Sequence, residues 1–376
     1  MARGRTITTI LAAAALMALP FAVRPDSSAA PLPTEVAVTR QQADPARFAA
    51  QNIVDVPVRF TVRNVNRSLA ACNVDGRTYQ VSGHLTAPER VLSAPNPAIT
   101  LYQHGIAAGE WYWRLDVPGY HHAEELAKRG HASLTLDRLG YGASSKPNGL
   151  SLCIGGEADV AHQIVQQLRA GTYELLGSVP GARATPRFAK VALAGQSNGG
   201  QIAQISTYSF RDVDALVIMD WTDLGLTPQA NARFFSSLQT CMRGGSPGGD
   251  DGADGYAYYD LGREEFRTGN FHDTDPAVLD AALPHQNRHP CGDMASQLSS
   301  VFVDLRHLSE IKVPVLLMYG ERDARVSGGQ EHRALFTGTT DVRLFDVPNA
   351  GHYMGLERNA PLVHDTLASW LDAHRL

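Results

Sequence analysis

A serine between glycines carries the strongest chemical signal in the sequence. The run Gly195-Gln196-Ser197-Asn198-Gly199 directly follows the apolar residues 191–194. A G-x-S-x-G motif that leaves a buried strand and opens a helix forms a tight turn and exposes the serine hydroxyl. The first amides of that helix point toward the hydroxyl and favour negative charge there. The motif predicts Ser197 as a nucleophile, against the plainer interpretation of a structural serine in a glycine-rich turn.

A serine hydroxyl needs a base at neutral pH, and two downstream residues fit the supporting roles. Asp323 lies just after the apolar run 315–319, and His352 follows the stretch 342–345 in a turn before the last helix. Both positions are expected at the carboxyl ends of strands, where open α/β sheets hold their sites. We expect His352 to take the proton of Ser197, and Asp323 to orient the imidazole and stabilise its charged form.

Two other carboxyl groups compete with Asp323 for the acid role. Asp220 directly follows the apolar run 215–219, and Asp223 lies three residues later. A triad is defined by its geometry and not by its place in the chain, so both stay open as alternatives. We expect the histidines near the predicted helices to be solvated or surface residues, namely His121, His122, His364 and His374.

The oxyanion of an acyl-transfer reaction needs two amide donors. Asn198 supplies the first, and the apolar run 99–103 ends in His104-Gly105-Ile106, where the Ile106 N–H is the candidate for the second. Gly105 lets the backbone approach the substrate oxygen. Trp111 belongs to an aromatic run that fits an acyl pocket or a core equally well. The candidate substrate-binding residues are His104, Gly105, Trp111 and Gln196.

The elements that must position these residues follow an α/β pattern. Period-two alternation predicts antiparallel strands at 56–62 and 78–86. Short uncharged apolar runs suit strands that are buried on both faces of a parallel sheet, and they occur at 98–102, 132–136, 191–194, 215–219 and 315–319. Helical patterns lie between or after them, at 123–129, 158–168, 199–208 and 360–374. Strands that alternate with helices predict a parallel sheet covered on both faces.

One region, residues 221–309, lacks this alternation. A structureless stretch of that length is unusual inside a compact domain, so we expect a partly helical cap inserted over the active site. Its Gly- and Asp-rich part, 244–255, does not match the EF-hand spacing and is expected to be a solvated loop.

Four cysteines and the N-terminus indicate export. Arg3 and Arg5 precede an apolar stretch and small residues, which predicts a signal peptide at 1–30, followed by an extended leader at 31–54. The secreted, extracellular location favours disulfides. Because two cysteines flank the insertion, the preferred pairing is Cys241 with Cys291, which leaves Cys72 with Cys153.

Composition excludes other classes. With 44% hydrophobic and 19% charged residues and a formal charge of −5, the chain is typical of a globular protein, and it has no basic stripe for nucleic acid. No stable membrane span is expected after signal cleavage. No metal site is expected, because CxxC is absent and the pair His285 and His289 lies between prolines that disfavour a helix.

Together these features resemble the α/β-hydrolase superfamily over roughly residues 55–376. The matching pieces are His104-Gly105, the 137–144 loop, the Ser197 turn, Gly320-x-x-Asp323 and Gly351-His352. The resemblance implies a core at 55–220 and 310–376, a mostly parallel sheet of about eight strands, and a cap after the sixth strand. With a serine as its nucleophile, the chain is similar to esterases, lipases, lactonases and thioesterases, and unlike haloalkane dehalogenases and epoxide hydrolases.

The resulting hypothesis is a secreted serine hydrolase that cleaves a small-molecule carboxylic ester through an acyl-enzyme intermediate, without a cofactor. One alternative is an exported aminopeptidase or amidase on the same fold, in which Asp250, Asp251 and Asp254 hold a free amine. The other is a binding protein without catalysis. The sequence leaves the physiological substrate and the oligomeric state open.

Overall fold

The computed structural model describes residue 48 and residues 52–179, 184–246 and 254–376. All of them belong to one unit, Arg40–Leu376. The predicted signal peptide at 1–30, most of the leader at 31–54, and both Asp250 and Asp251 lie outside the described residues. No helix in the described ranges combines the length and the apolar character that crossing a bilayer requires.

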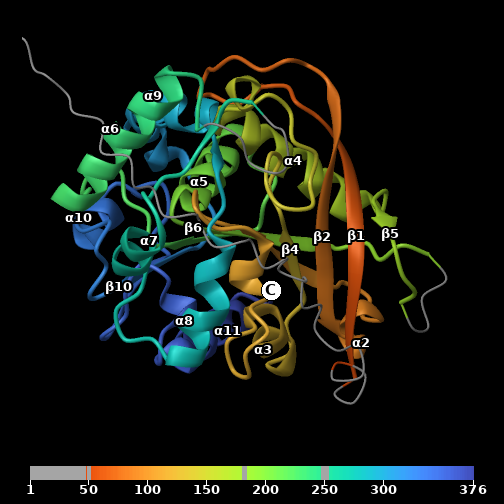
Figure 1. Ribbon diagram of the computed structural model, residues 1–376. Helices are drawn as coiled ribbons and strands as arrows, with labels where there is room; N and C mark the ends of the chain where they lie inside the picture. The colour runs from red at the N-terminus through yellow and green to blue at the C-terminus, as the bar shows by residue number, and fades with distance from the viewer. Residues whose placement is uncertain (1–47, 49–51, 180–183, 247–253) are drawn as a thin grey trace, which may run out of the picture. The chain divides into compact units, whose positions relative to one another are not determined.

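A mostly parallel sheet forms the centre of the described part and confirms the predicted fold class (Figure 1). Its nine strands lie in the order β11-β10-β7-β6-β3-β4-β2-β1-β5. The bounds are β1 (Ile53–Arg63), β2 (Thr78–Pro88), β3 (Ala98–Gln103), β4 (Ser133–Leu136), β5 (Glu174–Leu175), β6 (Lys190–Gln196), β7 (Ala215–Met219), β10 (Val315–Gly320) and β11 (Val342–Val347). The strands from β11 to β4 pair in parallel, whereas β2, β1 and β5 pair antiparallel at one end.

The sheet has nine strands where about eight were expected, and the difference is the two-residue edge strand β5. So short a strand has no periodicity that a sequence pattern can reveal. It pairs with Val58 and Arg59 of β1 and covers part of that strand's free edge.

Helices cover both faces of the sheet. The helices of the core are α2 (Glu89–Leu92), α3 (His122–Lys128), α4 (Ile154–Ala170), α5 (Asn198–Phe210), α10 (Gly329–Arg333) and α11 (Ala360–Ala373). In β6, Val191 and Leu193 pack in one hydrophobic cluster with α4 and α5, and Ala192 and Ala194 pack in the other with α3 and α11. A strand buried on both faces has no polar side, which explains the uninterrupted apolar runs of the sequence.

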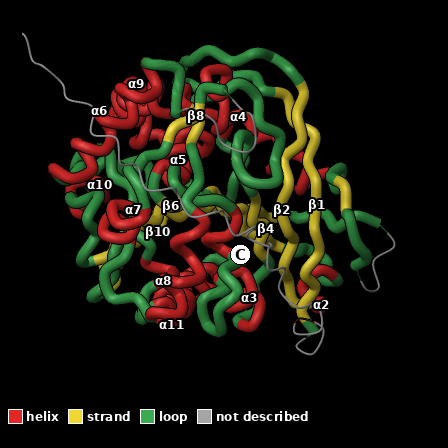
Figure 2. Tube along the Cα trace, viewed as in Figure 1, coloured by secondary structure: helices red, strands yellow, loops and turns green. Residues whose placement is uncertain are grey.

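Residues 221–309 contribute no strand to this sheet (Figure 2). The described elements of this inserted segment are α6 (Pro228–Met242), β8 (Tyr256–Ala257), α7 (Arg263–Asn270), α8 (Pro276–Ala282), β9 (His289–Pro290) and α9 (Cys291–His307). Strands β8 and β9 pair only with each other. The segment is therefore largely helical, and helix content of this kind explains the loss of strand alternation in the sequence.

Two disulfides brace different parts of the chain. Cys72 bonds to Cys153 at the start of α4, with a Cα–Cα distance of 6.3 Å. Cys241, near the end of α6, bonds to Cys291, the first residue of α9, with a Cα–Cα distance of 5.1 Å. This is the pairing favoured from the sequence. One bond thus tightens the core and the other closes the inserted segment.

Buried charged groups also join the inserted segment to the core. Arg138, which is 1% exposed, pairs with Glu157 of α4 at 3.0 Å and with Asp293 of α9 at 3.5 Å. Asp304 of α9 accepts hydrogen bonds from Gln201 at 3.0 Å and from Tyr208 at 2.9 Å. Since a buried charge or a buried polar group without its partner is costly, these contacts fix α9 against α4 and α5.

Three histidines expected in solvent are buried instead. His121, His122 and His364 are each at most 1% exposed. Helices α3 and α11 pack against one another, and the rings of His122 and His364 lie between them with centroids 5.1 Å apart. The expectation was wrong because helix periodicity does not show which second element covers a polar side chain. Burial, followed by the neighbouring His364, lowers the pKa of His122 well below its usual range, and burial lowers that of His364 to about 3.

Candidate active site

The candidate nucleophile lies on a strained turn between β6 and α5. Ser197 has φ 55° and ψ −133°, a conformation that a residue with a side chain rarely adopts. Its N–H donates to Met219 O at 2.8 Å, and its carbonyl accepts from Gly200 N at 2.7 Å. A Cβ on Gly195 would come within 2.1 Å of Gly199 O. The glycines of the motif are therefore required by backbone contact.

The loops after β10 and β11 bring the candidate base and acid together. His352 Nδ1 donates to Asp323 Oδ2 at 2.8 Å, and both side chains are at most 4% exposed. Asp323 Oδ1 accepts from the backbone N–H of Arg325 at 2.6 Å. Gln196 Nε2 donates to His352 O at 3.0 Å, which ties the histidine loop to the Ser197 turn. This tautomer leaves His352 Nε2 free to accept a proton.

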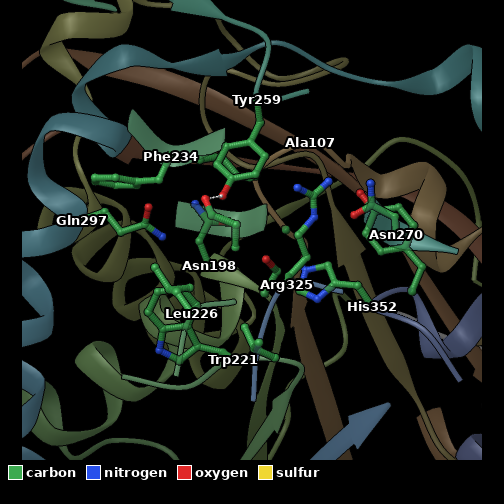
Figure 3. Close-up of a pocket in the computed structure, with 16 residues that line it drawn as sticks. Ala107, Asn198, Trp221, Leu226, Phe234, Tyr259, Asn270, Gln297, Arg325 and His352 are labelled. Carbon is green, nitrogen blue, oxygen red and sulfur yellow. Dashed lines mark hydrogen bonds between the residues drawn. The ribbon is translucent and has the colours of Figure 1, made fainter. Parts of the chain in front are cut away.

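Ser197 and His352 line the same cavity (Figure 3). No hydrogen bond joins the Ser197 hydroxyl to the imidazole in the described ranges of the chain. Such contacts are often long in unliganded enzymes and tighten when substrate binds. The three candidate triad residues, which lie far apart in the sequence, are thus gathered at one end of the sheet.

The alternative acids have different surroundings. Asp220 is fully buried, and its Oδ1 accepts the Gly320 N–H at 2.8 Å. Burial and then the adjacent Asp323 raise the pKa of Asp220 well above its usual range, which favours the protonated form. Asp223 Oδ2 lies 3.0 Å from His332 Nε2 and accepts a hydrogen bond from Gln204 Nε2 at 2.7 Å. The hydrogen bond of His352 is made to Asp323.

Asp220, Asp323 and His352 form the one cluster in the described residues that has the composition of a metal site. Ligand atoms of Asp220, Asp323 and His352 all lie within 4.8 Å of one another. A cation bound there would compete with the hydrogen bond between His352 and Asp323. Hydrogen bonds to the Gly320 N–H and between His352 and Asp323 account for the arrangement.

Two amides face the cavity without an acceptor. Ile106 and Asn198 both line it, and neither backbone N–H has a hydrogen-bond partner within the described part of the chain. Buried donors are normally paired, so two free donors beside a strained serine need a functional explanation. Donors held in advance at this place stabilise a developing oxyanion without reorganising.

The predicted substrate-binding residues divide into two groups. Gly105 lines the cavity, and a Cβ there would come within 2.9 Å of Ser197 Cβ, so the loop reaches the serine only as glycine. His104, Gln196 and Trp111 are not among the lining residues. His104 is buried, accepts the Arg138 N–H at 3.0 Å and therefore supports the loop. The side chain of Trp111 stacks on His285, with ring centroids 5.6 Å apart.

Sequence reasoning missed most of the cavity wall. The lining side chains that no motif revealed include Trp221, Phe234, Tyr259, Asn270, Arg325 and Tyr353. Four of these six belong to residues 221–309, where no period or spacing marks a binding residue. Arg325 had one usable signal, since it lies two residues after the predicted acid.

Comparison with known proteins identifies the fold. The model of the alpha/beta hydrolase family matches residues 104–365. No curated protein sequence matches the chain. An esterase from Thermogutta terrifontis superposes with a TM-score of 0.58 at 18% identity, over 84% of this chain and 100% of its own. An enol-lactonase from Burkholderia xenovorans superposes with a TM-score of 0.55 at 15% identity, over 78% of this chain and 97% of its own. A monoacylglycerol lipase from Paleococcus ferrophilus superposes with a TM-score of 0.54 at 18% identity, over 77% of this chain and 96% of its own. At such identities these structures show a shared fold.

Proposed function

Because the chain belongs to the alpha/beta hydrolase family, we propose that it is a serine hydrolase that cleaves carboxylic esters through an acyl-enzyme intermediate. One observation carries the proposal. His352, which is hydrogen-bonded to Asp323, borders one cavity together with the strained Ser197 and two residues whose amides are unpartnered. This combination supplies a base, a nucleophile and an oxyanion site, which is the full set that acyl transfer requires.

In the first half-reaction, Ser197 Oγ attacks the ester carbonyl while His352 Nε2 takes the hydroxyl proton. The carbonyl oxygen gains the negative charge and is held by the amides of Ile106 and Asn198. Asp323 stabilises the imidazolium. As the tetrahedral intermediate collapses, His352 gives its proton to the leaving alkoxide. An alcohol departs, and the acyl group remains on Ser197.

In the second half-reaction, water replaces the alcohol. His352 takes one proton of the water, and the resulting hydroxide attacks the acyl carbon. The second tetrahedral intermediate uses the same two amides. Its collapse breaks the bond to Ser197 Oγ, which recovers the proton from His352. The products are a carboxylic acid and an alcohol, and the enzyme returns to its starting state.

The cavity wall supports an ester substrate over a peptide with a free amine. None of the described residues that line the cavity carries a carboxylate. Of the acidic residues considered for holding an amine, Asp254 is exposed and is not part of the lining, and the other two lie outside the described residues. A protonated amine inside this cavity would lose its hydration without gaining a partner, which is unfavourable.

We further propose that the inserted segment is a cap over the site and that the protein is exported. Phe234, Tyr259 and Gln297, all from residues 221–309, line the cavity that contains Ser197. Two disulfides support an oxidising compartment, in agreement with the signal-like residues 1–30 of the sequence.

Hydrolysis assays on purified protein test the proposed function. We expect 4-nitrophenyl butyrate to be cleaved far faster than alanine 4-nitroanilide. Ser197→Ala and His352→Ala should each lower kcat on the ester by roughly 10⁴-fold or more, because the triad acts as a unit. Faster cleavage of the anilide would support the amidase alternative. A native protein that cleaves neither compound would support the binding-protein alternative.

A further inference from the structure

Arg325 places a charged side chain inside the proposed catalytic cavity. It lies in the loop after β10, where its own N–H donates to Asp323 Oδ1 at 2.6 Å and its carbonyl accepts from Thr227 N at 3.0 Å. The side chain is buried, with 4% of the residue exposed, yet it lines the cavity together with Ser197 and His352 (Figure 3). The loop that holds the proposed triad acid therefore also fixes the origin of this side chain.

The guanidinium group is held by contacts with the inserted segment. Its Nη2 donates to Asp260 Oδ1 at 2.6 Å, and its carbon lies 5.1 Å from the centre of the Tyr259 ring. A Cβ on Gly269 would come within 2.1 Å of Nη2, so α7 leaves space for the group only by having glycine there. Because these contacts fix its orientation in advance, a ligand would bind it with little loss of conformational freedom.

One edge of this group remains without a partner. Arg325 Nη1 is buried and has no hydrogen-bond acceptor in the described part of the chain. Asp260, which engages Nη2, is fully buried and is not among the residues that line the cavity. Figure 3 shows the guanidinium between the labelled side chains of Asn198 and Asn270, over His352 in this view. Asp260, which lies outside the cavity lining, thus holds Nη2 and leaves the Nη1 donor of this cavity-lining residue without a partner.

The described residues of the wall do not pair with this donor and offer no anionic group to it. Among the described lining residues, Arg325 is the only one with a permanent charge, and the others are apolar or neutral polar side chains, such as Phe234, Leu226 and Asn270. An ester with a plain alkyl chain would offer the buried Nη1 protons no acceptor, which is unfavourable. A carboxylate accepts charge-assisted hydrogen bonds from a guanidinium and matches its planar geometry.

We propose that Arg325 binds a free carboxylate on the substrate, so that the preferred substrates are esters that carry a second, anionic carboxylate group near the scissile carbonyl. This inference rests on the proposed ester hydrolysis and narrows its substrate class. The carboxylate belongs to the acyl part or to the alcohol part of the ester. The chemistry at Arg325 is the same in both cases, and matched substrates separate them.

Two pairs of benzyl esters provide the test. Monobenzyl succinate and benzyl butyrate differ only in a carboxylate that replaces the terminal methyl group of the acyl chain. 4-(Acetoxymethyl)benzoate and benzyl acetate differ only in a carboxylate on the alcohol. Release of the benzyl alcohols is followed by chromatography. The measured quantity is the ratio of kcat/KM for the charged ester to that for its neutral partner. This ratio does not depend on the fraction of protein that is correctly folded.

Three variants separate recognition from a structural role. Arg325→Met combined with Asp260→Asn removes both charges of the pair, so that no buried ion is left alone. Arg325→Lys keeps the charge but loses the planar set of donors. Arg322→Met is the matched control, because Arg322 lies in the same loop with its side chain 57% exposed. Each variant is assayed on all four esters.

We expect the wild-type ratio to exceed about 10 in one of the two pairs. The double variant should lower that ratio by roughly 10- to 150-fold, the range for losing a hydrogen bond to a charged group. Arg325→Lys should give an intermediate value, and Arg322→Met should leave the ratio unchanged. The pair that responds assigns the carboxylate to the acyl or the alcohol side.

Two results would overturn the inference, and they differ. Suppose that the neutral esters are cleaved, and that neither ratio exceeds unity or neither ratio falls when Arg325 is replaced. Carboxylate recognition by Arg325 is then wrong, while ester hydrolysis stands. If the wild-type protein cleaves none of the four esters, the proposed function itself fails, and the inference fails with it.

Discussion

The cavity has two walls of different construction. The wall formed by the core is set by the backbone, through the positive φ of Ser197, the free amides of Ile106 and Asn198, and the close approach of Gly105 to the serine turn. The wall formed by the inserted segment consists of side chains, such as Phe234 and Tyr259. Backbone geometry of this kind leaves a readable pattern of glycines, and packed side chains leave none.

This difference implies a division of labour between the two regions. Changes to the core wall should abolish the reaction, because they displace the reacting atoms. Changes to the inserted segment should alter substrate binding and leave the chemistry in place.

Adding a single methyl group at Gly199 should have the largest effect. In Gly199→Ala, the new Cβ would lie 2.4 Å from Gln103 O and 2.6 Å from His104 O, so strand β3 and helix α5 would have to separate. We expect loss of soluble folded protein or loss of all esterase activity, checked by circular dichroism and by the butyrate assay. Gly76→Ala is the control, since its Cβ meets nothing within 4 Å and pays only the strain of a positive φ, about 1–2 kcal/mol. A fully active Gly199→Ala would contradict the role assigned to the backbone of the core wall.

The two neighbouring carboxyl groups should respond very differently to amide substitution. Asp323→Asn should lower kcat by roughly 10⁴-fold, because it disturbs the tautomer and charge of His352. Asp220→Asn should lower kcat less than about 10-fold. Burial and then Asp323 raise the pKa of Asp220, which favours its protonated form, and a neutral amide resembles the protonated acid. Steady-state kinetics on both variants measure this. The reverse order of effects would transfer the acid role to Asp220.

The two disulfides should report on the two regions separately. In the chain-entropy view, bonds that span 50 and 81 residues each contribute about 4 kcal/mol. Replacing Cys72 and Cys153 by serine should lower the free energy of unfolding with KM unchanged. Replacing Cys241 and Cys291 should raise KM for esters several-fold, with a smaller change in kcat. Denaturant titration and kinetics of both double variants provide the measurement. An unchanged KM in the second variant would argue against a cap that shapes the binding site.

The smallest effect concerns pH and the buried histidines between α3 and α11. The folded pKa of His364, about 3, and that of His122 lie below the ordinary histidine value. Below about pH 6.5 these histidines therefore bind protons in the unfolded chain but not in the folded protein. Their contribution to the free energy of unfolding is fully present above about pH 6.5 and falls as the pH decreases toward 3. The slope is at most about 1.4 kcal/mol per pH unit for each histidine.

Acid denaturation of His364→Gln tests this assignment. The variant should lose stability less steeply between pH 6 and pH 4 than the wild type. Equal slopes in the variant and the wild type would contradict the role assigned to the buried histidines.

The sequence could reveal the core because its constraints are local. Apolar runs marked β6, β7 and β10 to within two residues, since a strand covered on both faces needs an uninterrupted apolar sequence. Ser197 and Asp323 could be singled out because each follows such a run, and His352 because it follows the last predicted strand. The pairing of Cys241 with Cys291 followed from their positions on either side of one insertion.

The remainder depends on contacts between distant segments. Arg325 is held by Asp260, which lies 65 positions earlier, and no spacing rule connects the two. His122 and His364 were expected in solvent because the packing of α3 against α11 cannot be read from either helix alone. Trp111 has the composition of a pocket residue, yet its ring stacks on His285. In each case the deciding fact is which surfaces meet.

In the proposed reaction, the hydroxyl of Ser197 becomes the covalent nucleophile. The most direct test is to treat the native protein with a fluorophosphonate, digest it, and locate the adduct by mass spectrometry. We predict one phosphonyl group, carried by Ser197, and greatly slowed labelling in His352→Ala. An adduct on a different residue, or equal labelling of Ser197→Ala, would contradict the account.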